Sequence, residues 1–306
     1  MKTFKAHYEN KRVLVTGGAG FIGSNLVKEL VSIQAKVTVL DNFSSGTEKN
    51  LSSVINAIEL IEGNICNTEL CDSITQSKDI IFHLAAMVSV PLSINDPETC
   101  YRVNVQGTEN LLKAACNNAV MQFVFSSSSA VYGNQSQLCK ETIMPAPQSP
   151  YAESKLISET LCKKYTYLHS LSTSCLRYFN VYGKDQNPNG EYAAVVARFT
   201  EALLHKKPIT IYGDGLQTRD FIPVESVINA NLLLGMHQTA ECLVVNIASG
   251  KSITLLELIS QLENKLHTKA VEIIFTNARS GDIINSVADC SYYSELTQHL
   301  LSSVNQ

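Results

Sequence analysis

The sequence lacks the features of membrane, nucleic-acid-binding and zinc-binding proteins. It has no tryptophan, and no apolar run approaches the roughly 18 residues that a membrane span needs. The net charge of −4 provides no basic surface for nucleic acid. The nine cysteines include no C-x-x-C pair, which favours reduced thiols over disulfides or a metal site. Because residues 1–8 are also too polar for a secretory signal, we expect a cytoplasmic protein with no metal, nucleic-acid or membrane partner.

A glycine-rich segment near the start indicates nucleotide binding. The segment T-G-G-A-G-F-I-G, residues 16–23, follows an apolar run and leads into a stretch with helical spacing. Strand, glycine turn and helix together form the phosphate-binding unit of dinucleotide-binding folds, whereas a simple glycine-rich turn is the alternative. Gly17 permits the tight turn, Gly20 lets the backbone approach a pyrophosphate, and Gly23 lets the helix pack on the strand.

A carboxylate ends the second predicted strand, residues 36–41. Asp41 follows the glycines at about the 20-residue spacing of the acid that binds the adenosine ribose in such folds. A 2′-phosphate beside this carboxylate would cost roughly 4 kcal/mol for each like-charge pair near 4 Å. No arginine follows Asp41 to offset that repulsion. The predicted cofactor is therefore NAD and not NADP.

Short apolar runs alternate with helical patterns along most of the chain. The runs cover residues 58–61, 80–84, 123–125 and 173–176, and the longest helical patterns cover 101–117 and 151–169. This alternation predicts an α/β fold with a doubly wound parallel Rossmann sheet. Beyond residue 180 the strands near 209–212, 243–246 and 271–274 are shorter and less regular. We expect an NAD-binding domain, 1–180, interleaved with a smaller mixed α/β substrate lobe, 181–306, and a cleft between them.

Two polar features are expected at the carboxyl ends of the strands. The serine run 126–129 directly follows the apolar run 123–125, although a serine run alone is usually a solvated loop. Tyr151 and Lys155 lie four residues apart and therefore on one helix face, a spacing that surface pairs also show by chance.

Together with the glycine turn, these features resemble the short-chain dehydrogenase/reductase superfamily in its extended form. In that family a tyrosine is the general base or acid, a lysine binds the nicotinamide ribose, and a serine or threonine orients the substrate hydroxyl. The resemblance assigns these catalytic roles to Tyr151, Lys155 and Ser128. We further predict that Lys155 lowers the pKa of Tyr151, because a neighbouring ammonium stabilises the phenolate.

The serine loop S-S-S-S-A-V-Y-G, residues 126–133, distinguishes branches of that family. Nucleotide-sugar dehydratases and sugar-acid decarboxylases carry an acid one or two residues after the catalytic hydroxyl residue. This chain has Ser129 and Ala130 there, so it resembles the UDP-sugar 4-epimerases. The resemblance implies that hydride passes from the sugar C4 to NAD and returns to the other face of a 4-keto intermediate. NAD would then stay bound throughout.

The same resemblance implies a set of NAD contacts. They are Gly17, Gly20, Phe21, Ile22 and Gly23 in the turn, Asp41, Asn42, Ser45 and Gly46 after the second strand, and Asn64, Ile65, Leu84, Ala85, Ala86, Asn104, Ser126, Tyr151, Lys155, Tyr178 and Val181. Asn64 replaces the aspartate that is usual in the family, a mild departure.

The implied substrate contacts come mostly from later in the chain. They are Ser89, Ser128, Ser129, Tyr151, Asn180, Gln186, Ala194, Val195, Tyr212, Arg219, Arg279, Asp282 and Ser286. Tyr212 would stack on uracil, and the two arginines would pair with phosphates. Asp282 would bind the uridine ribose. For either arginine alone a surface salt bridge is the alternative. Ser286 occupies the position that controls the space beside the sugar 2-substituent, where small residues accompany N-acetylated sugars.

These features predict NAD-dependent C4 epimerisation of a UDP-hexose. UDP-GlcNAc and UDP-GalNAc are favoured, with UDP-glucose/UDP-galactose and the uronic acids as further substrates. A UDP-glucuronate 4-epimerase and a non-catalytic NAD-binding regulator are the alternatives. The resemblance also implies a homodimer with a four-helix interface from residues 101–117 and 151–169. Relatives continue beyond residues 288–289 with a further helix and tail, so the end of this chain at Gln306 is either native or truncated.

Overall fold

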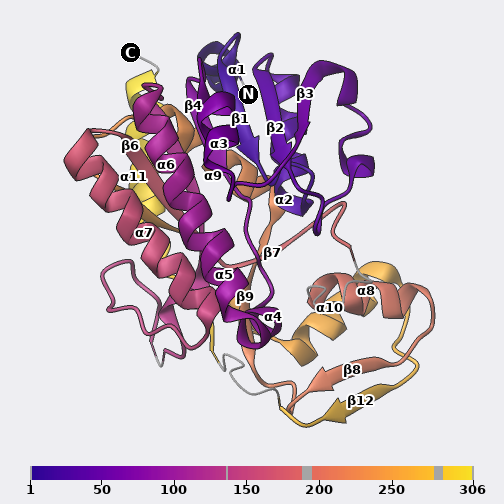
Figure 1. Ribbon diagram of the computed structural model, residues 1–306. Helices are drawn as coiled ribbons and strands as arrows, with labels where there is room; N and C mark the ends of the chain where they lie inside the picture. The colour runs from indigo at the N-terminus through magenta and orange to yellow at the C-terminus, as the bar shows by residue number, and fades with distance from the viewer. Residues whose placement is uncertain (1, 136, 188–194, 279–284, 305–306) are drawn as a thin grey trace.

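A seven-stranded parallel sheet dominates the computed structural model, which describes residues 2–135, 137–187, 195–278 and 285–304 (Figure 1). The strand order is β10-β6-β5-β4-β1-β2-β3. Its strands are β1 (Arg12–Thr16), β2 (Lys36–Asp41), β3 (Ile58–Glu62), β4 (Ile80–His83), β5 (Gln122–Ser128), β6 (Ser172–Tyr178) and β10 (Leu243–Ile247). The predicted α/β fold with a doubly wound parallel sheet is confirmed.

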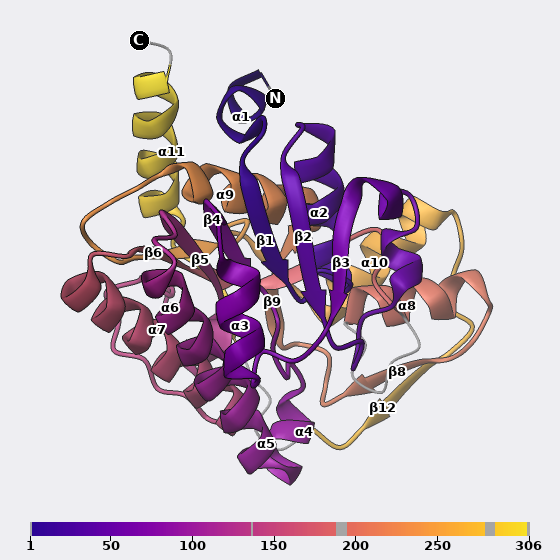
Figure 2. The same ribbon diagram turned by 45° about the horizontal axis from the view of Figure 1, so that its top comes forward.

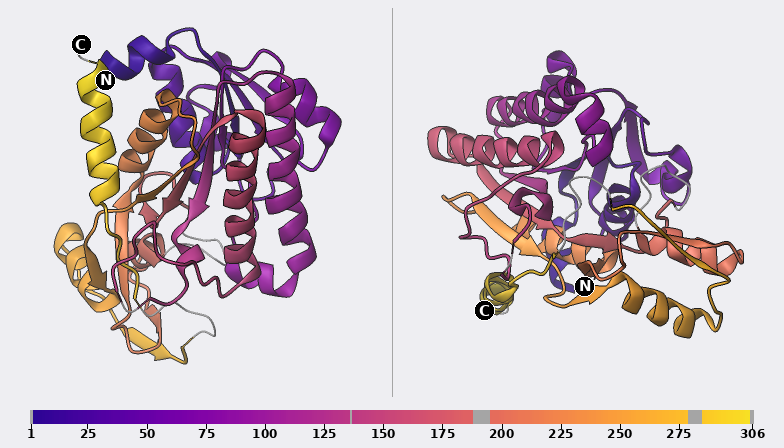
Figure 3. Two further views of the ribbon diagram at one scale, coloured as in Figure 1. Left: turned by 90° about the vertical axis from the view of Figure 1, so that its left-hand side faces the viewer. Right: turned by 90° about the horizontal axis from the view of Figure 1, so that it is seen from below.

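Helices cover both faces of this sheet, which explains why its strands are apolar on both sides. Val13 and Val15 face the core under α2 (Phe21–Ser32) and α9 (Val224–Met236), whereas Leu14 faces the opposite core. That second core lies under α3 (Thr68–Thr75), α6 (Gly107–Asn117) and α7 (Pro150–His169). The side chains alternate because successive residues of a strand point to opposite faces. Figures 2 and 3 show the two helix layers on either side of the sheet.

The predicted helix 101–117 is subdivided in the structure. It comprises the end of α5 (Pro97–Tyr101), a π-helical turn, η3 (Arg102–Gln106), and α6. The short helix α4 (Val90–Asn95) precedes it. The predicted helix 151–169 is α7, whose N-terminus is capped by Ser149 and has Pro150 in its first turn. Single 3₁₀ turns occur at η1 (Glu48–Leu51), η2 (Ile55–Ala57) and η4 (Ser129–Tyr132).

The part of the chain after residue 180 contributes to both lobes. The smaller lobe contains β7 (Asn180–Tyr182), α8 (Val195–Leu204), β8 (Ile209–Tyr212), β9 (Thr218–Pro223), β11 (Ser252–Thr254), α10 (Leu255–Leu266) and β12 (Ile273–Thr276). The strand near 243–246 was expected in this lobe, and that placement is wrong. It is β10, which pairs with β6 at the edge of the large sheet, since its apolar residues Val245 and Ile247 complete the core. The division at residue 180 stays a prediction.

Two terminal helices lie near one end of the large sheet (Figure 1). In α1 (Lys2–Tyr8), the buried Tyr8 hydroxyl donates a hydrogen bond to the Leu232 carbonyl of α9 at 2.7 Å. Helix α11 (Ser291–Val304) contacts β10. Within the described ranges, no helix has the length and apolar character of a membrane span.

Candidate active site

The glycine turn between β1 and α2 has the geometry of a phosphate-binding site. Gly17 has φ +70°, and a Cβ there would stand 2.6 Å from the Ala85 nitrogen. A Cβ on Gly23 would stand 2.2 Å from the Gly17 carbonyl oxygen, so both positions require glycine. Helix α2 has neither a side-chain cap at Gly20 nor an acid in its first turn. Its first N–H groups and positive dipole end therefore suit an anion.

The carboxylate of Asp41 is held beside this turn. Its Oδ2 accepts a hydrogen bond from the Ala19 nitrogen at 2.8 Å, and its Oδ1 accepts one from the Phe43 nitrogen at 2.9 Å. A Cβ on Gly46 would lie 2.6 Å from the Ala19 carbonyl carbon, so the loop after β2 packs closely on the turn. A carboxylate offers about four acceptor sites, which leaves capacity for ribose hydroxyls. These residues fit NAD, and their charge disfavours a 2′-phosphate.

A neutral histidine fixes the segment that crosses over the turn. His83, at the end of β4, lies 2.7 Å from the Thr16 hydroxyl through Nδ1 and 2.9 Å from the Thr108 hydroxyl through Nε2. Thr108 donates its proton to the Asn104 carbonyl, so Nε2–H donates to Thr108 and Nδ1 accepts from Thr16. Burial and, to a smaller extent, the charge of Lys155 lower the pKa of His83 to about 3. The imidazole is therefore neutral, and it positions the predicted cofactor segment 84–86.

Asn104 lies buried in the π-helical turn η3. Its side chain brackets Met87, donating to the Met87 carbonyl at 3.0 Å and accepting from the Met87 nitrogen at 2.7 Å. It also donates to the Ser154 hydroxyl on α7 at 2.9 Å. The amide thus joins the loop after β4 to the helix that carries Tyr151. Its predicted contact with the cofactor stays a prediction.

Ser128, Tyr151 and Lys155 meet where β5 ends against α7. Ser128 is the last residue of β5, and the Lys155 ammonium donates to the Ser126 carbonyl at 2.8 Å. The same ammonium lies 5.9 Å from the centre of the Tyr151 ring. The Tyr151 backbone nitrogen donates to the Ser93 hydroxyl of α4 at 3.1 Å, which fixes the start of the helix. The arrangement supports proton transfer at Tyr151.

The ionisation of these groups differs from the sequence expectation. Burial raises the pKa of Tyr151 above its ordinary value, while a hydrogen bond with Ser128 lowers it in part. Burial also lowers the pKa of Lys155 to about 8. The prediction that Lys155 lowers the pKa of Tyr151 below its usual value is therefore wrong for this structure. The ammonium bonds to a backbone carbonyl, and desolvation of the phenolate dominates.

Several other predicted cofactor residues have partners within the protein. The Ser126 hydroxyl lies 3.0 Å from the Tyr178 hydroxyl, which donates to Asn231 on α9 at 2.9 Å, so both side chains face the core. Asn42 and Asn64 accept hydrogen bonds from the nitrogens two residues later in their loops. The remaining predicted positions lie at the turn or on adjoining segments, namely Phe21 and Ile22 in α2, Ser45 after β2, Ile65 after β3, Leu84 to Ala86 after β4, and Val181 in β7.

A buried carboxylate lies beside two of the predicted substrate residues, Asn180 and Arg219. Asp220 on β9 accepts hydrogen bonds from the nitrogens of Ser249, Gly250 and Ala288 and from the Ser249 hydroxyl. The Asn180 side chain on β7 donates to the Asp220 carbonyl at 3.0 Å. Asp220 therefore joins three segments next to Arg219, the predicted phosphate ligand.

The other predicted substrate positions lie around this lobe and the loop after β4. Ser286 is buried, with 6% of its surface exposed, close in sequence to Ala288. Ser89 caps α4 and Ser129 begins η4. Val195 begins α8, Tyr212 ends β8, and the Gln186 side chain donates to the Val181 carbonyl at 3.1 Å. Ala194, Arg279 and Asp282 lie outside the described residues.

The sequence interpretation missed three residues next to the predicted catalytic residues. Ser127, Glu159 and Arg177 form a buried hydrogen-bonded set. Glu159 follows Lys155 at the same four-residue spacing that joins Tyr151 to Lys155, and Arg177 is a cation within an otherwise uncharged strand. Those two signals were available in the sequence.

Comparison with known proteins identifies the family. Residues 13–248 match the model of the NAD dependent epimerase/dehydratase family, and the chain belongs to that family. A curated relative, a putative UDP-glucose 4-epimerase from Methanocaldococcus jannaschii, is 35% identical over 280 residues. The match covers 90% of this chain and 89% of the relative.

Solved structures support the same branch. A UDP-N-acetylglucosamine 4-epimerase from Methanobrevibacter ruminantium in complex with UDP-N-acetylmuramic acid has a TM-score of 0.90 at 36% identity, covering 97% of this chain and 98% of that one. A UDP-glucose 4-epimerase from Thermotoga maritima with UDP-glucose has a TM-score of 0.89 at 35% identity, covering 94% and 92%. The predicted extended family, its UDP-sugar 4-epimerase branch, the enzymatic class and NAD as cofactor are confirmed.

Two glycine substitutions separate cofactor binding from folding. A Cβ on Gly20 would meet only the Gly17 oxygen, at 3.3 Å, a contact that a shift of a few tenths of an ångström relieves, so Gly20→Ala is expected to fold with little loss of stability. Its methyl group would stand where the turn approaches a phosphate, and the purified protein should lose most of its NAD. Gly23→Ala, which places its methyl group on the Gly17 carbonyl, should instead lose about 1–3 kcal/mol of stability. Thermal melting and NAD content of both proteins provide the test. A Gly20→Ala protein with full NAD would contradict the assigned phosphate site.

Proposed function

We propose that this protein interconverts UDP-GlcNAc and UDP-GalNAc by inverting the sugar C4. The choice of sugar rests on Ser286, which is small and buried. By the resemblance, the residue at this position limits the size of the substituent on the sugar C2. The likeness to a UDP-N-acetylglucosamine 4-epimerase over nearly the whole chain supports it.

The residues of the site supply proton transfer and orientation. When bound, NAD accepts and returns hydride at its nicotinamide. Tyr151 takes the proton of the sugar 4-hydroxyl and later gives it back, and Ser128, hydrogen-bonded to Tyr151, orients that hydroxyl. Lys155, whose pKa is about 8, is mostly protonated at pH 7 and donates to the Ser126 carbonyl, so it holds the helix of Tyr151 against the strand end that carries Ser128.

Removing the Tyr151 hydroxyl tests the catalytic assignment. Tyr151→Phe keeps the ring but removes the proton acceptor, so we expect kcat to fall by about 10²–10⁴-fold. NAD content should be unchanged because the turn and Asp41 are intact. Tyr167→Phe is the matched control, since Tyr167 is 88% exposed near the far end of the same helix. Wild-type turnover by Tyr151→Phe would exclude the assigned role.

Proton NMR of the protein mixed with one UDP-sugar at a time tests the substrate. We expect new GalNAc anomeric signals from UDP-GlcNAc. Ser286→Tyr fills the space beside the sugar 2-substituent, and it should abolish this reaction while any turnover of UDP-glucose persists. Equal loss with both sugars would reject the role of Ser286. Turnover of UDP-glucuronate alone would instead identify a uronic acid epimerase.

We also propose a homodimer formed through α6 and α7. These helices lie side by side along one edge of the molecule (Figure 1), joined by the Lys164–Glu109 ion pair at 3.6 Å. Ile157 is partly exposed on α7 and belongs to none of the core clusters among the described residues. A second pair of helices would cover it.

The nine free thiols support a reducing, cytoplasmic location.

Sedimentation velocity tests the proposed dimer. The wild-type protein should sediment at twice the mass of one chain. Ile157→Arg places a charge at the proposed contact and should shift the mass to that of one chain with little change in melting temperature. A wild-type monomer, or a variant that remains a dimer, would contradict this interface.

A further inference from the structure

We propose that Glu159, paired with Arg177, is a positioning residue that holds Ser128 against Tyr151 by acting through Ser127. The inference rests on the catalytic roles proposed above for Ser128 and Tyr151. It adds to the site a buried ion pair that lies behind the reacting groups.

The serine run and α7 meet at three successive points. Ser128 lies close enough to Tyr151 to lower the pKa of that phenol, and the Ser126 carbonyl accepts from Lys155 at 2.8 Å. Between them in sequence, the Ser127 hydroxyl donates to Glu159 Oε1 at 2.6 Å. The three helix residues follow one another at four-residue spacing and thus share one helix face. The strand end that presents Ser128 is therefore fixed by the same helix that presents Tyr151.

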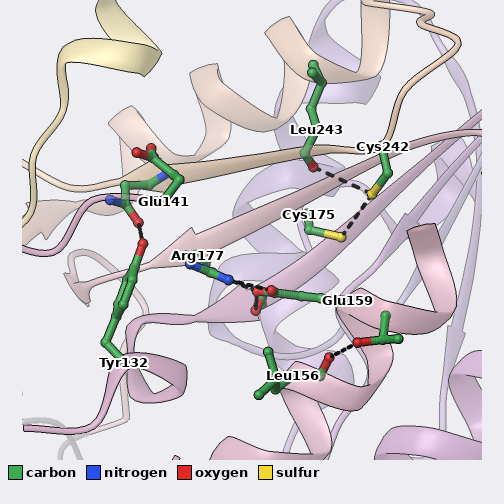
Figure 4. Close-up of polar contacts among 11 residues, drawn as sticks. Tyr132, Glu141, Leu156, Glu159, Cys175, Arg177, Cys242 and Leu243 are labelled. Atoms are coloured by element: carbon green, nitrogen blue, oxygen red, sulfur yellow. Dashed lines mark hydrogen bonds and ion pairs between the residues drawn. The ribbon is translucent and has the colours of Figure 1, made fainter. Parts of the chain in front are cut away.

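Arg177 connects this helix to the segment that follows Ser128. Its Nε donates to Glu159 Oε1 at 2.9 Å and its Nη2 to Oε2 at 2.6 Å, so the pair is bidentate and fully buried (Figure 4). The guanidinium also lies 4.7 Å from the ring centre of Tyr132 in η4. The Tyr132 hydroxyl donates to Asn246 on β10 at 2.7 Å. Ser128 therefore lies in sequence between Ser127, which contacts Glu159, and Tyr132, which contacts Arg177.

Stability alone is a weak explanation for this pair. Two buried charges lose their hydration, and apolar side chains of similar volume often stabilise a fold equally well. A bidentate carboxylate–guanidinium pair does fix direction, since both planar groups must align. The guanidinium also offsets the buried negative charge of the carboxylate that accepts from Ser127. Precise placement of the serine run is the property that an apolar pair would not provide.

Ser127→Ala tests the link without disturbing the ion pair. Misplacing Ser128 should lower kcat by about 10–100-fold, because small errors of position at a reacting centre have effects of that order. The KM for the UDP-sugar that the wild-type protein converts should stay within about twofold, and NAD content and melting temperature should match the wild type. Ser127→Thr retains the hydroxyl and should restore most of the lost kcat.

Ser174→Ala is the matched control. Ser174 is equally buried on β6, and its hydroxyl accepts from Gln122 at 3.1 Å, away from the serine run. Its kcat should be near that of the wild type. Wild-type kcat for Ser127→Ala would overturn the inference, as would a loss that Ser127→Thr fails to restore or that Ser174→Ala reproduces.

Two further variants keep the outcomes separate. Glu159→Gln can still accept from Ser127 but leaves Arg177 without a carboxylate, so both melting temperature and kcat should fall. A Glu159→Gln protein with full kcat would overturn the inference. Tyr151→Phe reports on the proposed function itself. If it is inactive while Ser127→Ala is fully active, only the positioning role fails, whereas an active Tyr151→Phe protein removes the catalytic assignment.

Discussion

The hydrogen bond from Lys155 to the Ser126 carbonyl joins the two elements on which the active site depends. One is the carboxyl end of β5, and the other is helix α7. The ammonium is buried, so its charge must be met by a fixed dipole, and the strand end supplies one. The same strand end carries Ser128, and the same helix carries Tyr151. The chemistry of the site is thus set by how a helix is docked on a sheet.

Uncharged polar side chains hold the segments around the glycine turn in place. His83 is neutral, with a proton arrangement fixed by Thr16 and Thr108. Asn104 uses its amide to hold the loop after β4 against α7. Together with the close approach of Gly17 to Ala85, these contacts fix the backbone around the glycine turn. The family's cofactor therefore meets a surface whose backbone is already in place.

The sequence predicted what is encoded locally. The glycine turn, the acid at Asp41 and the helix carrying Tyr151 and Lys155 depend on spacing within a few residues, and the structure has strands and helices at those places. It did not predict properties that arise from distant contacts. The position of β10 depends on its pairing with β6, and the pKa of Tyr151 depends on burial by several elements. The partnership of Glu159 with Arg177 needs α7 to lie on β6, although both residues were visible in the sequence.

The late entry of β10 into the large sheet has a consequence for how the protein is made. Until residues 243–247 have left the ribosome, β6 is an open sheet edge whose N–H and C=O groups are available to other chains. Helix α9, which covers one face of that sheet, is also made late. The cofactor-binding half therefore cannot complete its core during its own synthesis. The core of the large sheet therefore closes only after α9 and β10 have both been made.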